Sequence, residues 1–164
     1  MSTTSDIQER KYESHYDAGT CDFWITPVQS THEHTAEEIV QNLIGERNIY
    51  AFSWAARGRR LLKAEDRICF YIAQKGVVGH AKIVSSPQER ICDWISHPEK
   101  YPWVIDLKDV QLYLDQPISL DATTRNKLEA FNGRENKGNF GWFVRSTRRI
   151  SQNDFVVLTS RLPG

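Results

Sequence analysis

The sequence predicts an α+β protein, built as a small, bent β-barrel with short helices on its flanks. Along residues 67–74 the apolar side chains Ile68, Phe70 and Ile72 share one face, and Cys69, Tyr71 and Ala73 share the other. A strand without a polar face is buried on both sides. The apolar alternation of residues 103–114 changes parity near Lys108 and Asp109, which indicates a β-bulge. Bulges bend strands, as barrel closure requires.

Length and composition fit one globular domain. The chain has 164 residues, of which we assign 21–164 to the domain and 1–20, polar and unpatterned, to a disordered tail. The formal net charge of zero leaves no global field to attract nucleic acid or a membrane. Three widely spaced cysteines without a Cys-x-x-Cys motif favour structural thiols in a reducing compartment. No stretch is long and apolar enough to span a bilayer, and there is no signal-peptide core, so with the cysteine pattern we expect a cytoplasmic protein. We also expect a monomer.

The first half of the domain contains two strands and one helix. A strand over residues 21–26 should end at Pro27. The sequence from Thr35 to Glu38 is a capping box, which predicts a helix that Gly45 ends. A short strand over residues 49–54 should follow and leave Trp54 at the rim of the barrel.

The buried strand over residues 67–74 should pair with residues 77–84 in a hairpin. Lys75-Gly76 supplies the turn, because glycine accepts a positive φ. Gly79 interrupts the second strand, as at a bulge or where another backbone comes close. We expect Cys69 to be a buried thiol with a raised pKa. The Tyr71 hydroxyl either faces the pocket floor or satisfies a backbone group.

Capping signals and alternation predict the second half. Ser86 to Glu89 reads as a capping box for a helix that carries Ile91, Trp94 and Ile95, and a long strand opens at Tyr101-Pro102. Asp121 should cap a helix that buries Leu128 and Phe131 and ends at Gly133. Residues 140–145 should form a strand, and Ser151 should begin a last helix that buries Phe155, Val156 and Leu158.

No set of residues indicates catalysis, a metal or a cofactor, so we expect a protein that is not an enzyme. His32-Glu33-His34 lacks the helical spacing of a zinc site, and adjacent strand residues point to opposite faces. His80 lies in an apolar strand, where a histidine satisfied in the core is expected rather than a base.

Two basic clusters lie beside aromatic residues. The first comprises Arg57, Arg59, Arg60 and Lys63, and the second comprises Arg134, Lys137, Arg145, Arg148 and Arg149. Phe52 and Trp54 precede the first cluster, and Phe140, Trp142 and Phe143 lie within the second. Cations bind phosphates and aromatic rings stack on bases, so this combination suits a single strand or a flipped base. Alternatively, the clusters are solvated faces and the aromatic residues fill the core.

The order of short motifs along the chain resembles the EVE domain, a PUA-like family related to the YTH readers of methylated adenine in RNA. The motifs are Phe23-Trp24-Ile25, Phe52-Ser53-Trp54, Asp66 to Tyr71, Gly79 to Val84, Tyr101-Pro102, Pro117 to Leu120 and Ile150 to Phe155. The resemblance implies an aromatic-walled pocket for a modified base, chiefly modified cytosine in DNA. Pro27-Val28 departs from the Lys-Ser pair often found there in the family, and Asp66-Arg67 replaces its usual Gly-Asp.

The resemblance and the basic clusters together define the expected site. Candidate ligand-binding residues are Trp24, Phe52, Ser53, Trp54, Tyr71, Trp94, Tyr101 and Trp103, and candidate nucleic-acid backbone contacts are Arg57, Arg59, Arg60, Arg145 and Arg148. Trp54 should form one pocket wall, and Trp94, Tyr101 or Trp103 the second. The expected partner is modified DNA or RNA, which the protein would bind without catalysing a reaction on it. The alternatives are an RNA-binding or RNA-processing protein and a module that binds a peptide or small ligand.

Overall fold

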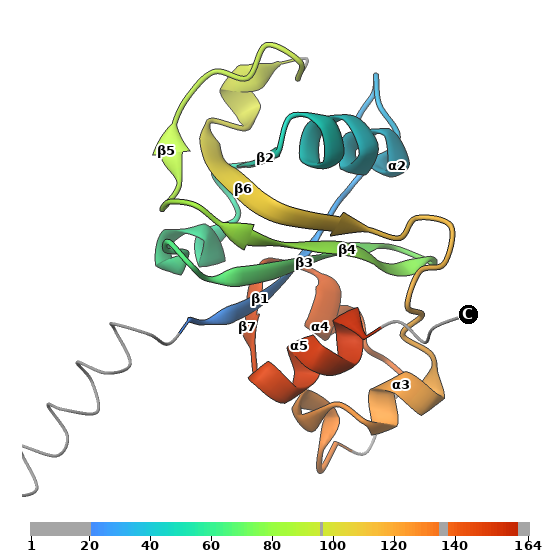
Figure 1. Ribbon diagram of the computed structural model, residues 1–164. Helices are drawn as coiled ribbons and strands as arrows, with labels where there is room; N and C mark the ends of the chain where they lie inside the picture. The colour runs from blue at the N-terminus through green and yellow to red at the C-terminus, as the bar shows by residue number, and fades with distance from the viewer. Residues whose placement is uncertain (1–20, 96, 135–137, 161–164) are drawn as a thin grey trace, which may run out of the picture.

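The computed structural model describes residues 21–95, 97–134 and 138–160, so the expected tail and Lys137 of the second basic cluster lie outside it. Its described strands form one curled, mixed sheet with the order β2-β6-β4-β3-β1-β7, and the short β5 pairs with β6 (Figure 1). The strands are β1 (Phe23–Pro27), β2 (Ile49–Phe52), β3 (Arg67–Ile72), β4 (Gly76–Ile83), β5 (Gln88–Glu89), β6 (Trp103–Leu112) and β7 (Arg148–Ile150). This half-barrel confirms the α+β prediction.

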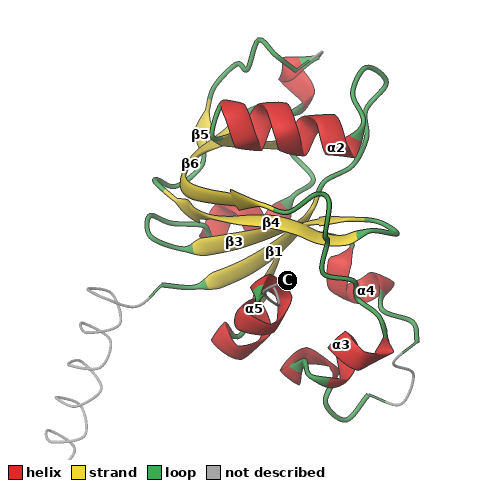
Figure 2. Ribbon diagram, turned by 45° about the vertical axis from the view of Figure 1, so that its right-hand side comes forward, coloured by secondary structure: helices red, strands yellow, loops and turns green. Residues whose placement is uncertain are grey.

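Short helices cover both faces of the sheet (Figure 2). On one face lies a helix whose first turn is α2 (Ala36–Glu38) and whose continuation is the π-helical η1 (Ile39–Glu46). The opposite face carries α3 (Ala122–Asn126), α4 (Gly141–Val144) and α5 (Gln152–Thr159). Three 3₁₀ turns, η2 (Arg57–Leu61), η3 (Pro98–Lys100) and η4 (Glu129–Phe131), complete the elements.

The sheet separates two hydrophobic cores, because the central strand β3 is apolar on both faces. Ile68 and Phe70 pack beneath the α2–η1 helix with Leu43. On the other face Cys69 and Tyr71 pack with the apolar side chains of α4 and α5. The expected burial of Cys69 is confirmed, and burial raises the pKa of its thiol.

The glycines of the hairpin lie where backbones cross. Gly76 has a φ of 122°, and a β-carbon there would overlap the carbonyl of Ile118. At Gly79 a β-carbon would lie 2.8 Å from the carbonyl oxygen of Gln111 in β6. The expectation that another backbone approaches Gly79 is therefore confirmed.

The β-bulge in the long strand is also confirmed. Lys82 pairs with Lys108, whereas His80, two residues earlier in β4, pairs with Gln111, three residues later in β6. The extra residue is absorbed at Asp109, which has a φ of 53°. His80 and the Tyr113 hydroxyl share a hydrogen bond of 3.0 Å, and burial lowers the pKa of His80. The expected hydrogen-bond partner is therefore present, but His80 is only half-buried.

The predicted helix caps at Thr35, Asp121 and Ser151 are confirmed, since each side chain accepts from the amide three residues on. The Thr35–Glu38 capping box is complete in both directions. Among the helices of the described residues, none is both long and apolar enough to cross a bilayer.

Besides the helix from Asp121, which ends at Asn126 and is followed by the separate η4 instead of running to Gly133, three local predictions are wrong. The helix expected after Ser86 does not form, because Gln88 and Glu89 pair with the free edge of β6 instead. Residues 140–145 are not a strand but contain α4, which lets Phe140, Phe143 and Val144 share one face at spacings of three and four residues.

The third error concerns α5. Phe155 and Leu158 are buried as expected, three residues apart on one helix face. Val156 lies on the opposite side of this short helix and is 51% exposed.

Candidate functional site

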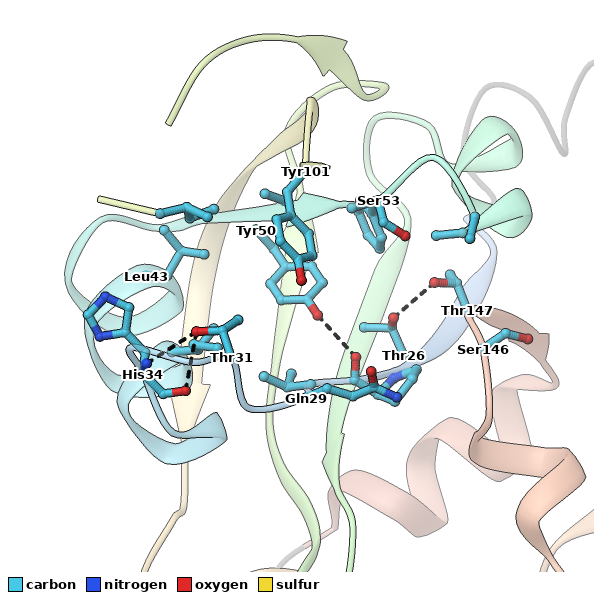
Figure 3. Close-up of a pocket in the computed structure, with 18 of the residues that line it drawn as sticks. Thr26, Gln29, Thr31, His34, Leu43, Tyr50, Ser53, Tyr101, Ser146 and Thr147 are labelled. Carbon is cyan, nitrogen blue, oxygen red and sulfur yellow. Dashed lines mark hydrogen bonds between the residues drawn. The ribbon is translucent and has the colours of Figure 1, made fainter. Parts of the chain in front are cut away.

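A pocket of about 270 Å³ lies at the seam where the curled sheet fails to close (Figure 3). One lip is β2, the first strand in the spatial order. The other lip is the end of β1 with the segment that leads into β7, the strand at the far end of that order. The helix residues Ile39 and Leu43 close the back. The bend of the sheet therefore creates the pocket.

Aromatic side chains form much of its wall. Tyr50 and Phe52 come from β2 and meet edge to face, with ring centroids 5.0 Å apart. The Tyr50 hydroxyl donates to the carbonyl of Pro27 at 3.0 Å, and burial raises its pKa, so it stays protonated. The Tyr101 ring enters just before β6 and lies beside Tyr50 in Figure 3. Flat apolar rings of this kind suit a planar ligand.

Trp94 forms one end of the pocket and is held by stacking. Its indole lies parallel to the His34 ring, with centroids 3.9 Å apart and an interplanar angle of 13°. His34 in turn lies 3.8 Å from the Glu38 carboxylate. On the same indole sits Arg47, whose guanidinium carbon is 5.5 Å from the ring centroid. The segment that carries Trp94 has no regular secondary structure, and the contacts of Trp94 with His34 and Arg47 hold it in position.

The opposite end is polar and carries no acid. The hydroxyls of Thr26 and Thr147 are hydrogen-bonded to each other at 2.9 Å across the β1–β7 junction. Ser53 and Ser146 add hydroxyls, and the exposed Arg145 adds a positive charge. None of the described residues that line the pocket is Asp, Glu, Lys or Cys. The site therefore favours neutral or anionic groups over cations.

The structure brings together five of the residues predicted for the site. The predicted residues that line the pocket are Phe52, Ser53, Trp94, Tyr101 and Arg145. Of the three candidates for a second wall, Trp94 and Tyr101 are placed there and Trp103 is not.

Two predicted pocket residues lie elsewhere. Trp24 is 1% exposed in the core, where its indole nitrogen donates to the Asp66 carboxylate at 3.0 Å. Its strand is paired on both edges and covered by the α2–η1 helix, so its ring is out of reach. Tyr71 faces the other core and lines a separate, open depression near α4.

Trp54 lies just outside the pocket. The β pattern predicted its ring on the face of Tyr50 and Phe52, but β2 ends at Phe52 and the chain turns. Trp54 instead packs edge to face on Trp103, with centroids 5.2 Å apart, and is 56% exposed. Both indoles contact the guanidinium of Arg59.

The arginines expected around the pocket separate into different settings. Arg57 and Arg60 are exposed on η2, whereas Arg59 in the same turn is 3% exposed. Arg148 is half-buried on the indole of Trp142, which the guanidinium of Arg134 also covers. Only Arg145 lies at the pocket itself.

Sequence reasoning missed Tyr50, Thr26, His34 and Thr147 as pocket residues. Tyr50 had a signal, because it alternates in phase with Phe52 along β2. The threonine pair and His34 had none, since their position depends on contacts between distant segments. Within the described chain, no group of three or more His, Cys, Asp or Glu could hold a metal ion.

Comparisons with known proteins identify the fold. No protein-family model matches the sequence, and no curated protein matches it either. A protein from Pseudomonas syringae has a similar structure, with a TM-score of 0.52 at 16% identity over 82% of this chain and 95% of its own. A protein from Rhodopseudomonas palustris gives 0.52 at 14% identity over 84% and 90%. The YTH domain of Mmi1, solved in complex with RNA, gives 0.52 at 13% identity over 82% and 73%. The fold is therefore similar to that of the YTH domain, and membership of the PUA-like EVE family stays a prediction.

Proposed function

We propose that this chain is a non-enzymatic reader that takes a modified base of a nucleic-acid strand into the seam pocket. The observation that carries the proposal is the pocket itself, which joins aromatic walls, several hydroxyls and one exposed arginine, with no carboxylate among its described lining residues. Its volume of about 270 Å³ suits one planar ring rather than a larger ligand. The Mmi1 YTH domain, which shares the fold, was solved with RNA, and this supports nucleic acid as the ligand class.

The energetics suit a flipped base. Unstacking a base costs a few kcal/mol, and stacking on aromatic rings returns about 1–3 kcal/mol per base. Tyr101 and Trp94 offer such rings, and Arg145 stands at the mouth, where a phosphate would pass. A methyl group buried against the wall adds about 0.8 kcal/mol, or roughly fourfold in affinity.

The charge of the pocket narrows the choice of ligand. With Arg145 at the wall and no acid among the described lining residues, a neutral modified base should bind better than a base made cationic by methylation. The same argument disfavours a methyl-lysine peptide, which gains from cation–π contacts but needs a site that tolerates positive charge. A pocket without Asp, Glu, Lys or Cys among its described lining residues also offers few groups for acid–base or nucleophilic catalysis.

A binding screen tests the proposal. Single-stranded and duplex oligonucleotides, as DNA and as RNA, would carry 5-methylcytosine, 5-hydroxymethylcytosine, N6-methyladenine or no modification, at one stated salt concentration. We expect at least one neutral modified base to bind severalfold tighter than its unmodified counterpart. Modified cytosine in DNA and modified bases in RNA are separate arms of the screen, so the result also distinguishes a DNA ligand from an RNA ligand.

Variants of the wall link binding to the pocket. Tyr101→Ala should lower the affinity for the preferred oligonucleotide about tenfold or more. Tyr101→Phe keeps the ring and should keep most of the affinity. Val156→Ala, which removes an exposed apolar side chain of α5 outside the pocket lining, serves as the matched control. Equal binding of modified and unmodified strands by the wild type would overturn the proposal.

A further inference from the structure

Trp54 is an exposed indole that its neighbours hold in one orientation. It is 56% exposed, yet Trp103 meets its ring edge-on at an interplanar angle of 86°. The Arg59 guanidinium carbon lies 5.9 Å from the Trp54 ring and 4.8 Å from the Trp103 ring. Large apolar side chains that are both exposed and braced from behind are typical of contact surfaces rather than of core packing.

Arg59 is an unusual brace, because it is a buried cation without an anion. The residue is 3% exposed, and its Nε has no hydrogen-bond partner among the described residues. It also takes part in none of the salt bridges within the described ranges. The indole Nε1 of Trp103 beside it is likewise buried without a partner. Burial of an unpaired charge is costly, so the arrangement calls for a reason outside the folding of the chain.

Exposed arginines flank the platform, by which we mean the Trp54 indole with Trp103 and Arg59 behind it. The segment from Trp54 to Leu62 contains Arg57, Arg59 and Arg60 and no acidic residue. Arg57 and Arg60 are exposed, and neither appears in a salt bridge of the described residues. A planar ring beside several unneutralised guanidinium groups matches a base attached to its phosphates.

The platform is fixed to the rim of the pocket. A β-carbon on Gly58 would lie 2.5 Å from the carbonyl oxygen of Thr147, so the backbone of η2 rests directly on the pocket lip. Ser53 and Ala55 line the pocket, while Trp54 between them is not among its lining residues. One turn of chain thus separates the pocket from the platform.

We propose that Trp54, braced by Trp103 and Arg59, is a second stacking site, which binds the base next to the one held in the pocket of a single strand. Arg57 and Arg60 contact the phosphates of that strand. The inference rests on the proposed function for the identity of the pocket ligand. It adds a subsite that binds without regard to base modification.

The test compares ligands that reach one site or both. The free modified nucleoside carries one base and no phosphate, so it can fill only one of the two sites at a time, and its modification directs it to the pocket. A five-nucleotide single strand can fill the pocket and the platform together. Trp54→Ala should lower the affinity for the five-nucleotide strand about tenfold and leave the affinity for the nucleoside unchanged. Trp54→Phe should retain most of the affinity, and Val156→Ala, which truncates another exposed apolar side chain on the far layer, should change nothing.

An unmodified thymidine or uridine strand separates this inference from the proposed function. If modified and unmodified strands bind alike but Trp54→Ala weakens both, the platform stands and the reader function fails. If Tyr101→Ala abolishes selective binding while Trp54→Ala binds as the wild type does, the platform is overturned and the reader function stands. Failure of every oligonucleotide to bind would overturn both.

Discussion

Two buried charges in this molecule have opposite surroundings. Asp66 is fully buried and accepts from the Trp24 indole, from two backbone amides and from the Lys63 ammonium at 2.8 Å. These donors stabilise the carboxylate and tie β1 to the turn before β3. Arg59, by contrast, is buried against two indoles without a carboxylate. The first charge is neutralised within the fold, and the second has no anionic partner among the described residues.

Asp66→Ala should lower the free energy of unfolding by roughly 3–5 kcal/mol, because it leaves several buried donors without their acceptor and removes one of the two carboxylates that Lys63 contacts. Denaturant titration measures the change. The control, Asp115→Ala, alters an exposed carboxylate and should stay within about 0.5 kcal/mol of the wild type. A loss below about 1 kcal/mol for Asp66→Ala would contradict the assignment.

Arg59→Met should keep the free energy of unfolding within about 1 kcal/mol of the wild type or raise it, because the variant removes a buried unpaired charge and retains a long apolar stem. Thermal and denaturant unfolding report the effect. A loss of several kcal/mol would show that the guanidinium has a structural partner after all.

Single elements show where local sequence signals succeed and where they fail. The caps at Thr35, Asp121 and Ser151 were predictable because each depends on residues within three positions. The pattern Ser86 to Glu89 meets the same local rule, but Gln88 and Glu89 pair with β6 instead. Here a distant sheet edge overrides a local preference.

The bulge in β6 offers a test at this scale. Asp109→Gly should be neutral or slightly stabilising, because glycine accepts the φ of 53° without strain. Asp109→Val should cost about 1–2 kcal/mol, since a β-branched residue is disfavoured in the left-handed region. The two variants differ at one exposed position, so denaturant unfolding isolates the backbone effect. Equal stability would show that the register shift is taken up elsewhere.

The whole molecule is two cores on either side of one sheet, and its thiols report on that arrangement. Cys69 is fully buried at the centre of β3, and burial raises its pKa, whereas Cys21 is partly exposed. We expect Cys21 to react first with a thiol reagent in the folded protein. Cys69 should react only at the rate of global unfolding, with a denaturant dependence that matches it. Rapid alkylation of Cys69 under native conditions would refute this description, and Cys21→Ser removes the signal of the faster thiol.

The fold could be predicted further than the site, for a physical reason. The two-faced pattern of β3 and the parity change at Asp109 are local, and they predicted a bent sheet with two covered faces. The pocket depends on which distant segments meet at the seam. Phe52 and Tyr101 were found because aromatic residues at strand ends stand out. Thr26 and Thr147 were missed, because only the pairing of β1 with β7 brings their hydroxyls together.

The position of the seam also affects how the protein folds during its synthesis. One lip is β2, early in the chain, and the other includes Ser146 and Thr147, which follow almost all of the sheet. On the ribosome, β2 to β6 can emerge and pair while β1 still lacks its β7 neighbour. Closing such a distant contact carries a large loop entropy and is slow. If the pocket binds a base as proposed, we therefore expect a nascent chain to acquire that binding only after β7 has left the exit tunnel, however much of its sheet is already formed.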